Sequence, residues 1–83
     1  MAIQEQLEIL DGGIEAWNSW RTAHPDVQID LTGADLRNLD LSGVDLARAR
    51  LEGANFANSD LQRASLASAN LSSACLAFAD LES

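Results

Sequence analysis

The chain has few or none of several residues on which common classes of protein depend. None of its 83 residues is a tyrosine or a lysine, and cysteine, histidine and proline occur once each. One cysteine, Cys75, excludes an internal disulfide, and one histidine, His24, excludes a zinc site built from a cysteine and histidine cluster. No stretch approaches the length of a membrane-spanning helix, and residues 1–5 lack the basic and apolar regions of a signal peptide. We therefore expect a cytoplasmic protein.

Positive charge is also scarce. The formal net charge is −8, and the five cations are all arginines: Arg21, Arg37, Arg48, Arg50 and Arg63. A surface that binds nucleic acid or a membrane directly needs basic patches, so neither is an expected partner. The sequence also contains no nucleophile paired with a base and no glycine loop of a phosphate-binding kind. We expect no enzymatic activity, no cofactor and no metal site.

What the chain does have is an apolar anchor at every fifth position. A period of five fits neither the stripe of an α-helix, near 3.6, nor the alternation of a flat strand, near 2. It fits a solenoid in which each five-residue unit forms one side of a coil and then turns a corner. The core anchors are Leu31, Leu36, Leu41, Leu46, Leu51, Phe56, Leu61, Leu66, Leu71, Leu76 and Leu81.

The residues around each anchor repeat as well. A small residue stands two places before most anchors and Asp or Asn one place before, as in Ala-Asp-Leu-Arg-Asn at residues 34–38 and Ala-Asn-Phe-Ala-Asn at residues 54–58. This pattern resembles the pentapeptide-repeat family. The resemblance implies an all-β solenoid, a right-handed quadrilateral β-helix with four repeats to a coil. Eleven repeats in residues 28–83 would then form about 2.75 coils.

Residues 1–27 differ from the repeats and predict an N-terminal helical cap. Two amphipathic helices are expected, separated by the glycine pair at residues 12–13, with the second at 14–23 before Pro25. A solenoid exposes unpaired backbone at its first coil, which such helices can cover. The segment resembles the leader of cyanobacterial pentapeptide-repeat proteins. The apolar cap residues are Ile3, Leu7, Leu10, Ile14, Trp17 and Trp20.

A coil of twenty residues aligns side chains that are twenty positions apart. The inner residues of the first coil are bulky at Ile29, Leu39 and Val44, next to the expected cap, whereas later coils have only Ala or Ser there. On the outside, the same spacing predicts an acidic ladder of carboxylates. A flat ladder does not converge on one point as a hard cation requires, so we expect no metal there. The ladder is Asp40, Asp60 and Asp80.

The last coil has no obvious cover in the sequence. We expect a homodimer in which a second copy covers this end in a two-fold arrangement, as characterised members of the resembling family often do. Two alternatives remain open: the chain is a fragment of a longer repeat, or the end is frayed in a monomer. The candidate dimer face is Leu71, Leu76, Phe78 and Leu81.

These features predict a structural or protein-interaction module that is not an enzyme and self-associates through its C-terminal coil. The alternative, drawn from the family resemblance, is a DNA mimic that modulates a DNA-acting enzyme such as gyrase. The net charge of −8 favours mimicry, whereas the small number of coils disfavours it. The sequence names no partner.

Overall fold

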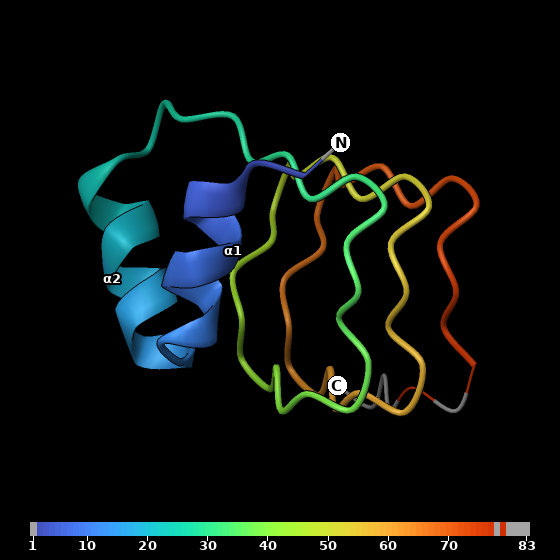
Figure 1. Cartoon of the computed structure of the whole chain (residues 1–83). Coiled ribbons are helices and arrows are strands. Elements are labelled where there is room, and N and C mark those ends of the chain that lie inside the picture. Colours follow the sequence, from blue (N-terminus) through green and yellow to red (C-terminus); the bar gives the residue numbers. More distant parts are fainter. Residues whose placement is uncertain (1, 78, 80–83) are drawn as a thin grey trace.

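The computed structural model describes residues 2–77 and 79. Two helices, α1 (Gln4–Asp11) and α2 (Ile14–Ala23), lie together at one end of the molecule, and the rest of the chain winds into a stack of coils (Figure 1). Gly13 separates the helices because its φ of 111° lies outside the range that a side chain tolerates. The break and the second helix therefore fall where the sequence predicts them.

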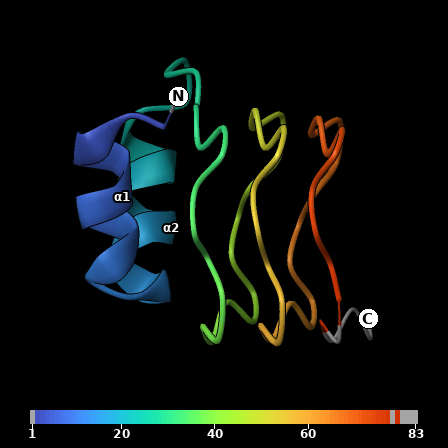
Figure 2. The ribbon, with the colours of Figure 1, turned by 45° about the vertical axis from the view of Figure 1, so that its right-hand side comes forward.

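The coils pair through residues that are twenty positions apart. Six parallel β-bridges join the residue before an anchor to its counterpart in the next coil: Asp30 with Arg50, Asp35 with Asn55, Asp40 with Asp60, Asp45 with Ser65, Arg50 with Asn70 and Asn55 with Cys75. The twenty-residue spacing is thus confirmed. Figure 2 shows the successive coils running side by side away from the helices. We call residues 29–48 the first coil.

The expectation of an all-β solenoid, a right-handed quadrilateral β-helix, is wrong. The described residues contain two α-helices, of eight and ten residues, and no β-strand. Every bridge is isolated, so no ladder of consecutive pairs forms a sheet.

Local backbone geometry explains the absence of strands in the described repeats. Each repeat contributes one bridging residue and then a turn, and the second residue after each anchor from Leu31 to Leu71 has a positive φ, between 59° and 76°. Such a left-handed residue ends the extended conformation before a second neighbour can pair. Glycine occupies this position at Gly33, Gly43 and Gly53, while Asn, Arg or Ser adopts the positive φ in the other repeats.

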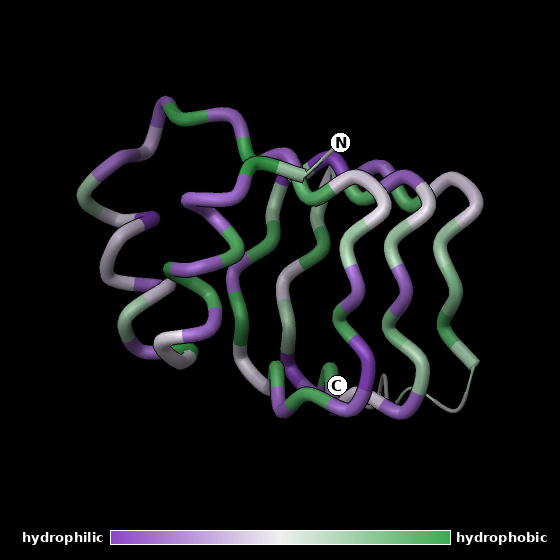
Figure 3. The backbone as a smooth tube through the Cα atoms, in the orientation of Figure 1, coloured by the Kyte–Doolittle hydropathy of each residue, from purple (hydrophilic) through white to green (hydrophobic). Residues whose placement is uncertain are grey.

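The core runs along the axis of the stack. The anchors from Leu31 to Leu61 are each at most 2% exposed, and small inner residues such as Ala49 and Ala54 pack between them. Figure 3 shows hydrophobic and hydrophilic positions alternating along the coils. Trp17 is also fully buried and joins this core from α2. One continuous apolar cluster therefore connects the helices to the repeats.

Candidate functional site

Side chains and backbone near the start of the chain complete the first coil at Asp30. The Asp30 amide donates to Gln6 Oε1 at 2.8 Å, and the Asp30 carbonyl accepts from the Ile3 amide at 2.9 Å. Gln6 Nε2 also donates to the Gln28 carbonyl at 3.1 Å. These bonds occupy the groups that a preceding coil would otherwise pair with, so this side of the first coil is closed.

Helix α2 closes the side at Asp45 in the same way. The Asp45 amide donates to Asn18 Oδ1 at 2.9 Å, and the Asp45 carbonyl accepts from Trp17 Nε1 and Arg21 Nη1, both at 2.8 Å. Arg21 Nη2 donates to the Ala47 carbonyl at 3.0 Å. Arg21 is only 6% exposed, so its guanidinium is held by backbone carbonyls in place of water.

The apolar cap residues predicted from the sequence differ in their burial. Leu10 and Trp17 are buried, while Ile3 is 41% exposed. The buried polar partners Gln6 and Arg21 were not predicted. Gln6 stands four residues before the buried Leu10, and Arg21 stands four residues after the buried Trp17. This spacing places each polar residue on the buried face of its helix and could have identified it from the sequence. The half-buried members of the predicted set are Leu7, Ile14 and Trp20.

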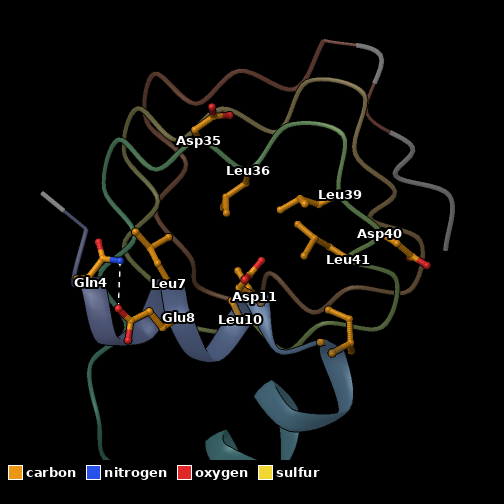
Figure 4. Close-up of a pocket in the computed structure, with 12 residues that line it drawn as sticks. Gln4, Leu7, Glu8, Leu10, Asp11, Asp35, Leu36, Leu39, Asp40 and Leu41 are labelled. Carbon is orange, nitrogen blue, oxygen red and sulfur yellow. Dashed lines mark hydrogen bonds between the residues drawn. The ribbon is translucent and has the colours of Figure 1, made fainter.

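A cavity of about 480 Å³ lies between α1 and the first coil, on the side away from Asp30 and Asp45. Figure 4 shows Leu36, Leu39 and Leu41 of the first coil pointing into this space across from Leu10. Leu39 is 37% exposed, although its position in the repeat is an inner one. The residues that line the cavity are Gln4, Leu7, Glu8, Leu10, Asp11, Gly13, Ile14, Asp35, Leu36, Leu39, Asp40 and Leu41.

The backbone beside the cavity is left unpaired on its outer side. Among the described residues, the amides and carbonyls of Asp35 and Asp40 have no hydrogen-bond partner, in contrast to those of Asp30 and Asp45. Of the bulky inner residues expected beneath the cap, Ile29 and Val44 lie on the closed sides and are at most 1% exposed. Leu39 lies on an open side. The helices thus close two sides of the first coil and leave two open.

Two residues of the predicted acidic ladder, Asp40 and Asp60, form a parallel bridge, and Asp80 lies outside the described residues. Each of these two carboxylates accepts hydrogen bonds from a residue of its own turn. Asp40 Oδ1 accepts from the hydroxyl of Ser42 at 2.7 Å and from its amide at 3.2 Å, and Asp60 Oδ1 accepts from the Gln62 amide at 3.0 Å. The two bonds from Ser42 lower the pKa of Asp40 below its ordinary value.

Other carboxylates of the repeats are bonded to arginine or threonine. Arg37 donates to both carboxylate oxygens of Asp35, at 2.8 and 2.9 Å, and this lowers the pKa of Asp35. Bonds from the hydroxyl and the amide of Thr32 lower the pKa of Asp30. These outward-facing carboxylates are therefore bonded to neighbouring residues of their own repeats.

The far end of the stack has a different character. Burial falls sharply at residue 64: the anchors Leu66, Leu71 and Leu76 are half-buried, unlike those before them. The amides of Leu66, Ser68, Leu71 and Ser73 have no partner within the described part of the chain. We call residues 64–77 and 79 the C-terminal edge. Two residues of the candidate dimer face, Phe78 and Leu81, lie outside the described residues.

Within residues 2–77 and 79, no three or more His, Cys, Asp or Glu side chains gather in a way that could hold a metal ion. No helix of this part of the chain has the length and apolar character needed to cross a membrane.

Comparison with known proteins identifies the repeats. The family model for pentapeptide repeats matches residues 27–53 and 49–83, in eight copies, and so covers more than half of the chain. The match begins after α2, so it does not test the resemblance of residues 1–27 to a cyanobacterial leader. Neither the curated proteins nor the solved structures gave a match.

Proposed function

Because the chain belongs to the pentapeptide-repeat family, we propose that it is a protein-interaction module that self-associates through its C-terminal edge. The single observation that carries the proposal is the combination of half-buried leucines and unpaired backbone amides at this edge. In this proposal residues 1–27 act as a cap, and residues 28–83 form the interacting repeat.

The chemistry of the C-terminal edge suits a second copy of the same edge. Leu66, Leu71 and Leu76 offer apolar surface, and each leucine that becomes fully buried stabilises a contact by up to roughly 1.5–3 kcal/mol. The amides of Leu71 and Ser73, which have no partner among the described residues, add hydrogen-bond donors that water satisfies until a partner docks. A two-fold arrangement places equivalent leucines against each other and buries both edges at once.

Light scattering coupled to size exclusion tests this proposal. We expect the native chain to have twice its monomer mass of 8.9 kDa, and the double variant Leu71→Asp with Leu76→Asp to have the monomer mass. Two buried carboxylates facing two more across a two-fold axis are strongly unfavourable. A native monomer at the highest attainable concentration would reject the proposal without reference to any variant.

The matched control is Ser72→Asp with Ala77→Asp, which adds the same two charges at exposed positions of the same coil, away from the leucine row. It should remain a dimer. Circular dichroism of each variant, followed through thermal unfolding, separates loss of association from loss of fold. A control that dissociates as readily as the leucine variant would assign the effect to net charge and not to this edge.

The alternative, DNA mimicry, gains little support from the side-chain contacts. A mimic needs carboxylates free to stand in for phosphates, whereas Asp35 is bonded to Arg37 and Asp40 to Ser42. It stays a prediction, and it has a direct test. Reversal of charge at Asp40 and Asp60 should remove any effect on gyrase supercoiling if the ladder acts in this way.

A further inference from the structure

We propose that the cavity between α1 and the first coil binds an extended segment of another protein, one that carries a bulky apolar side chain beside a lysine or arginine. This site lies at the opposite end of the stack from the C-terminal edge (Figure 1). It is therefore a second binding surface, and it does not depend on self-association.

The first argument comes from the unpaired backbone. Asp30 and Asp45 show how the first coil is completed where a partner is present: an amide and a carbonyl at each are bonded to residues of the N-terminal segment. At Asp35 and Asp40 the same groups have no partner among the described residues. An extended segment that runs along either of these sides can pair with the groups there, as in strand addition at a sheet edge.

The second argument is the apolar floor. Leu36 and Leu41 are each 2% exposed, but Leu39 between them is 37% exposed to the cavity. Leu7 and Leu10 of α1 face the same space (Figure 4). A volume of about 480 Å³ accommodates one or two bulky side chains, and apolar ligand sites are commonly of this size. An apolar side chain placed here would cover Leu39.

The third argument is charge complementarity. Four carboxylates line the cavity, from Glu8, Asp11, Asp35 and Asp40. Arg37 pairs with Asp35, so the other three are the carboxylates that have no cationic partner among the described residues. The Asp11 side chain has no hydrogen-bond partner among the described residues, and the chain as a whole has a net charge of −8. A cationic segment is thus attracted both by the rim and by the field of the whole protein.

A second copy of this chain does not supply such a segment. The chain has no lysine. Arg21 is buried, and Arg37 and Arg50 are bonded to neighbouring carboxylates. Arg48 and Arg63 have φ values of 62° and 60° at corners of the stack, so neither lies in an extended stretch. The occupant is accordingly a different protein.

The test uses the full, isotope-labelled chain and three synthetic pentapeptides with blocked ends. The first is Arg-Leu-Lys-Leu-Arg; the second replaces both leucines with serine; the third replaces all cations with glutamate. We expect only the first to shift the amide resonances of Gly13, Asp35 and Asp40 in a saturable manner. Equal shifts with the serine peptide would show that charge alone holds the peptide, and they would overturn the proposal. The absence of any saturable shift at these residues would also overturn it.

Substitution of residues that line the cavity tests whether the peptide binds at this site. Replacing exposed Asp11 and Asp40 with Asn should weaken binding by roughly two- to five-fold per carboxylate, the range of exposed ion pairs. Leu39→Arg should abolish binding, because it fills the cavity with a cation. The matched control is Glu15→Gln with Asp26→Asn, two exposed carboxylates that do not line the cavity. Equal weakening in the control would show that net charge, and not this site, holds the peptide.

Discussion

The hydroxyl of Ser59 accepts a hydrogen bond from the backbone amide of Leu39 at 3.2 Å, across two neighbouring coils. The same hydroxyl donates to the carbonyl of Leu36. In the other described turns the inner residue's amide donates directly to the anchor carbonyl three positions earlier, as Ala54 does to Leu51 at 3.0 Å. Ser59 thus stands inside the turn that Leu39 holds open, and it is only 2% exposed.

This arrangement predicts that Ser59 and Leu39 are energetically coupled. Ser59→Ala should lower the free energy of unfolding by about 1–3 kcal/mol, because a buried carbonyl loses its donor. With Leu39→Ala the turn can close its own bond, so the same serine change should cost less. A double-mutant cycle in urea measures the coupling. Additive effects would show that the two residues act independently; Ser65→Ala, on an exposed side chain, serves as the control.

Arg21 is predicted to fasten α2 to the first coil. Arg21→Met keeps an unbranched apolar stem but removes the guanidinium and its bonds to the carbonyls of Asp45 and Ala47. Hydrogen bonds from a charged donor are worth about 1.5–3 kcal/mol, so we expect a loss of stability of that size. Thermal unfolding followed by tryptophan fluorescence reports it through Trp17. Arg63→Met, at an exposed position, should have almost no effect, and a similar loss there would contradict the assignment.

At the corner formed by Gly53, the cost of a substitution is predicted to depend on how readily the new residue adopts the left-handed backbone conformation. Its φ is 71°, and the nearest atom to a Cβ built there would be 3.9 Å away, so space is not limiting. Gly53→Val should cost more than about 1–2 kcal/mol because a β-branched residue resists this conformation, whereas Gly53→Asn should cost less than Gly53→Ala. Chemical unfolding of the three variants gives the order. Equal costs would mean that the backbone relaxes out of this conformation.

Stability should depend on pH through the turn aspartates. Hydrogen bonds lower the pKa values of Asp30 and Asp40 in the folded chain below the ordinary value of 3.8. Their stabilisation is therefore fully present above that value and is lost as the pH falls through the lower folded-state pKa values. Asn keeps the turn bond, as Asn55 shows with the Ala57 amide at 3.0 Å, but does not titrate in this range.

The matched comparison for this pH effect is the double variant Asp30→Asn with Asp40→Asn. We expect its melting temperature to fall less than that of the native chain when the pH is lowered from neutral to below 3.8. Circular dichroism at a series of pH values measures both chains. Parallel curves for the two would show that these carboxylates do not contribute to the acid sensitivity.

The period of the chain can be recognised from the sequence alone. Anchors five residues apart and small inner residues predict a coiled stack, and the family resemblance implies four repeats to a coil; the bridge from Asp35 to Asn55 has the resulting spacing of twenty. These features are local: each depends on residue types within one repeat. The inference failed where it converted the pattern into β-strands, because the left-handed corner after each anchor limits pairing to one residue per repeat.

The difference between the two ends of the stack depends on the three-dimensional packing. Whether an inner residue is buried depends on what lies above it, so Val44 is fully buried while Leu39, with a similar repeat position, is 37% exposed. The position of α1 and α2 over the first coil decides this, because Gln6 and Arg21 bond to the backbone on the sides of Asp30 and Asp45, whereas a cavity lies between α1 and the side of Leu39. Such contacts join residues more than twenty positions apart, and no five-residue pattern encodes them.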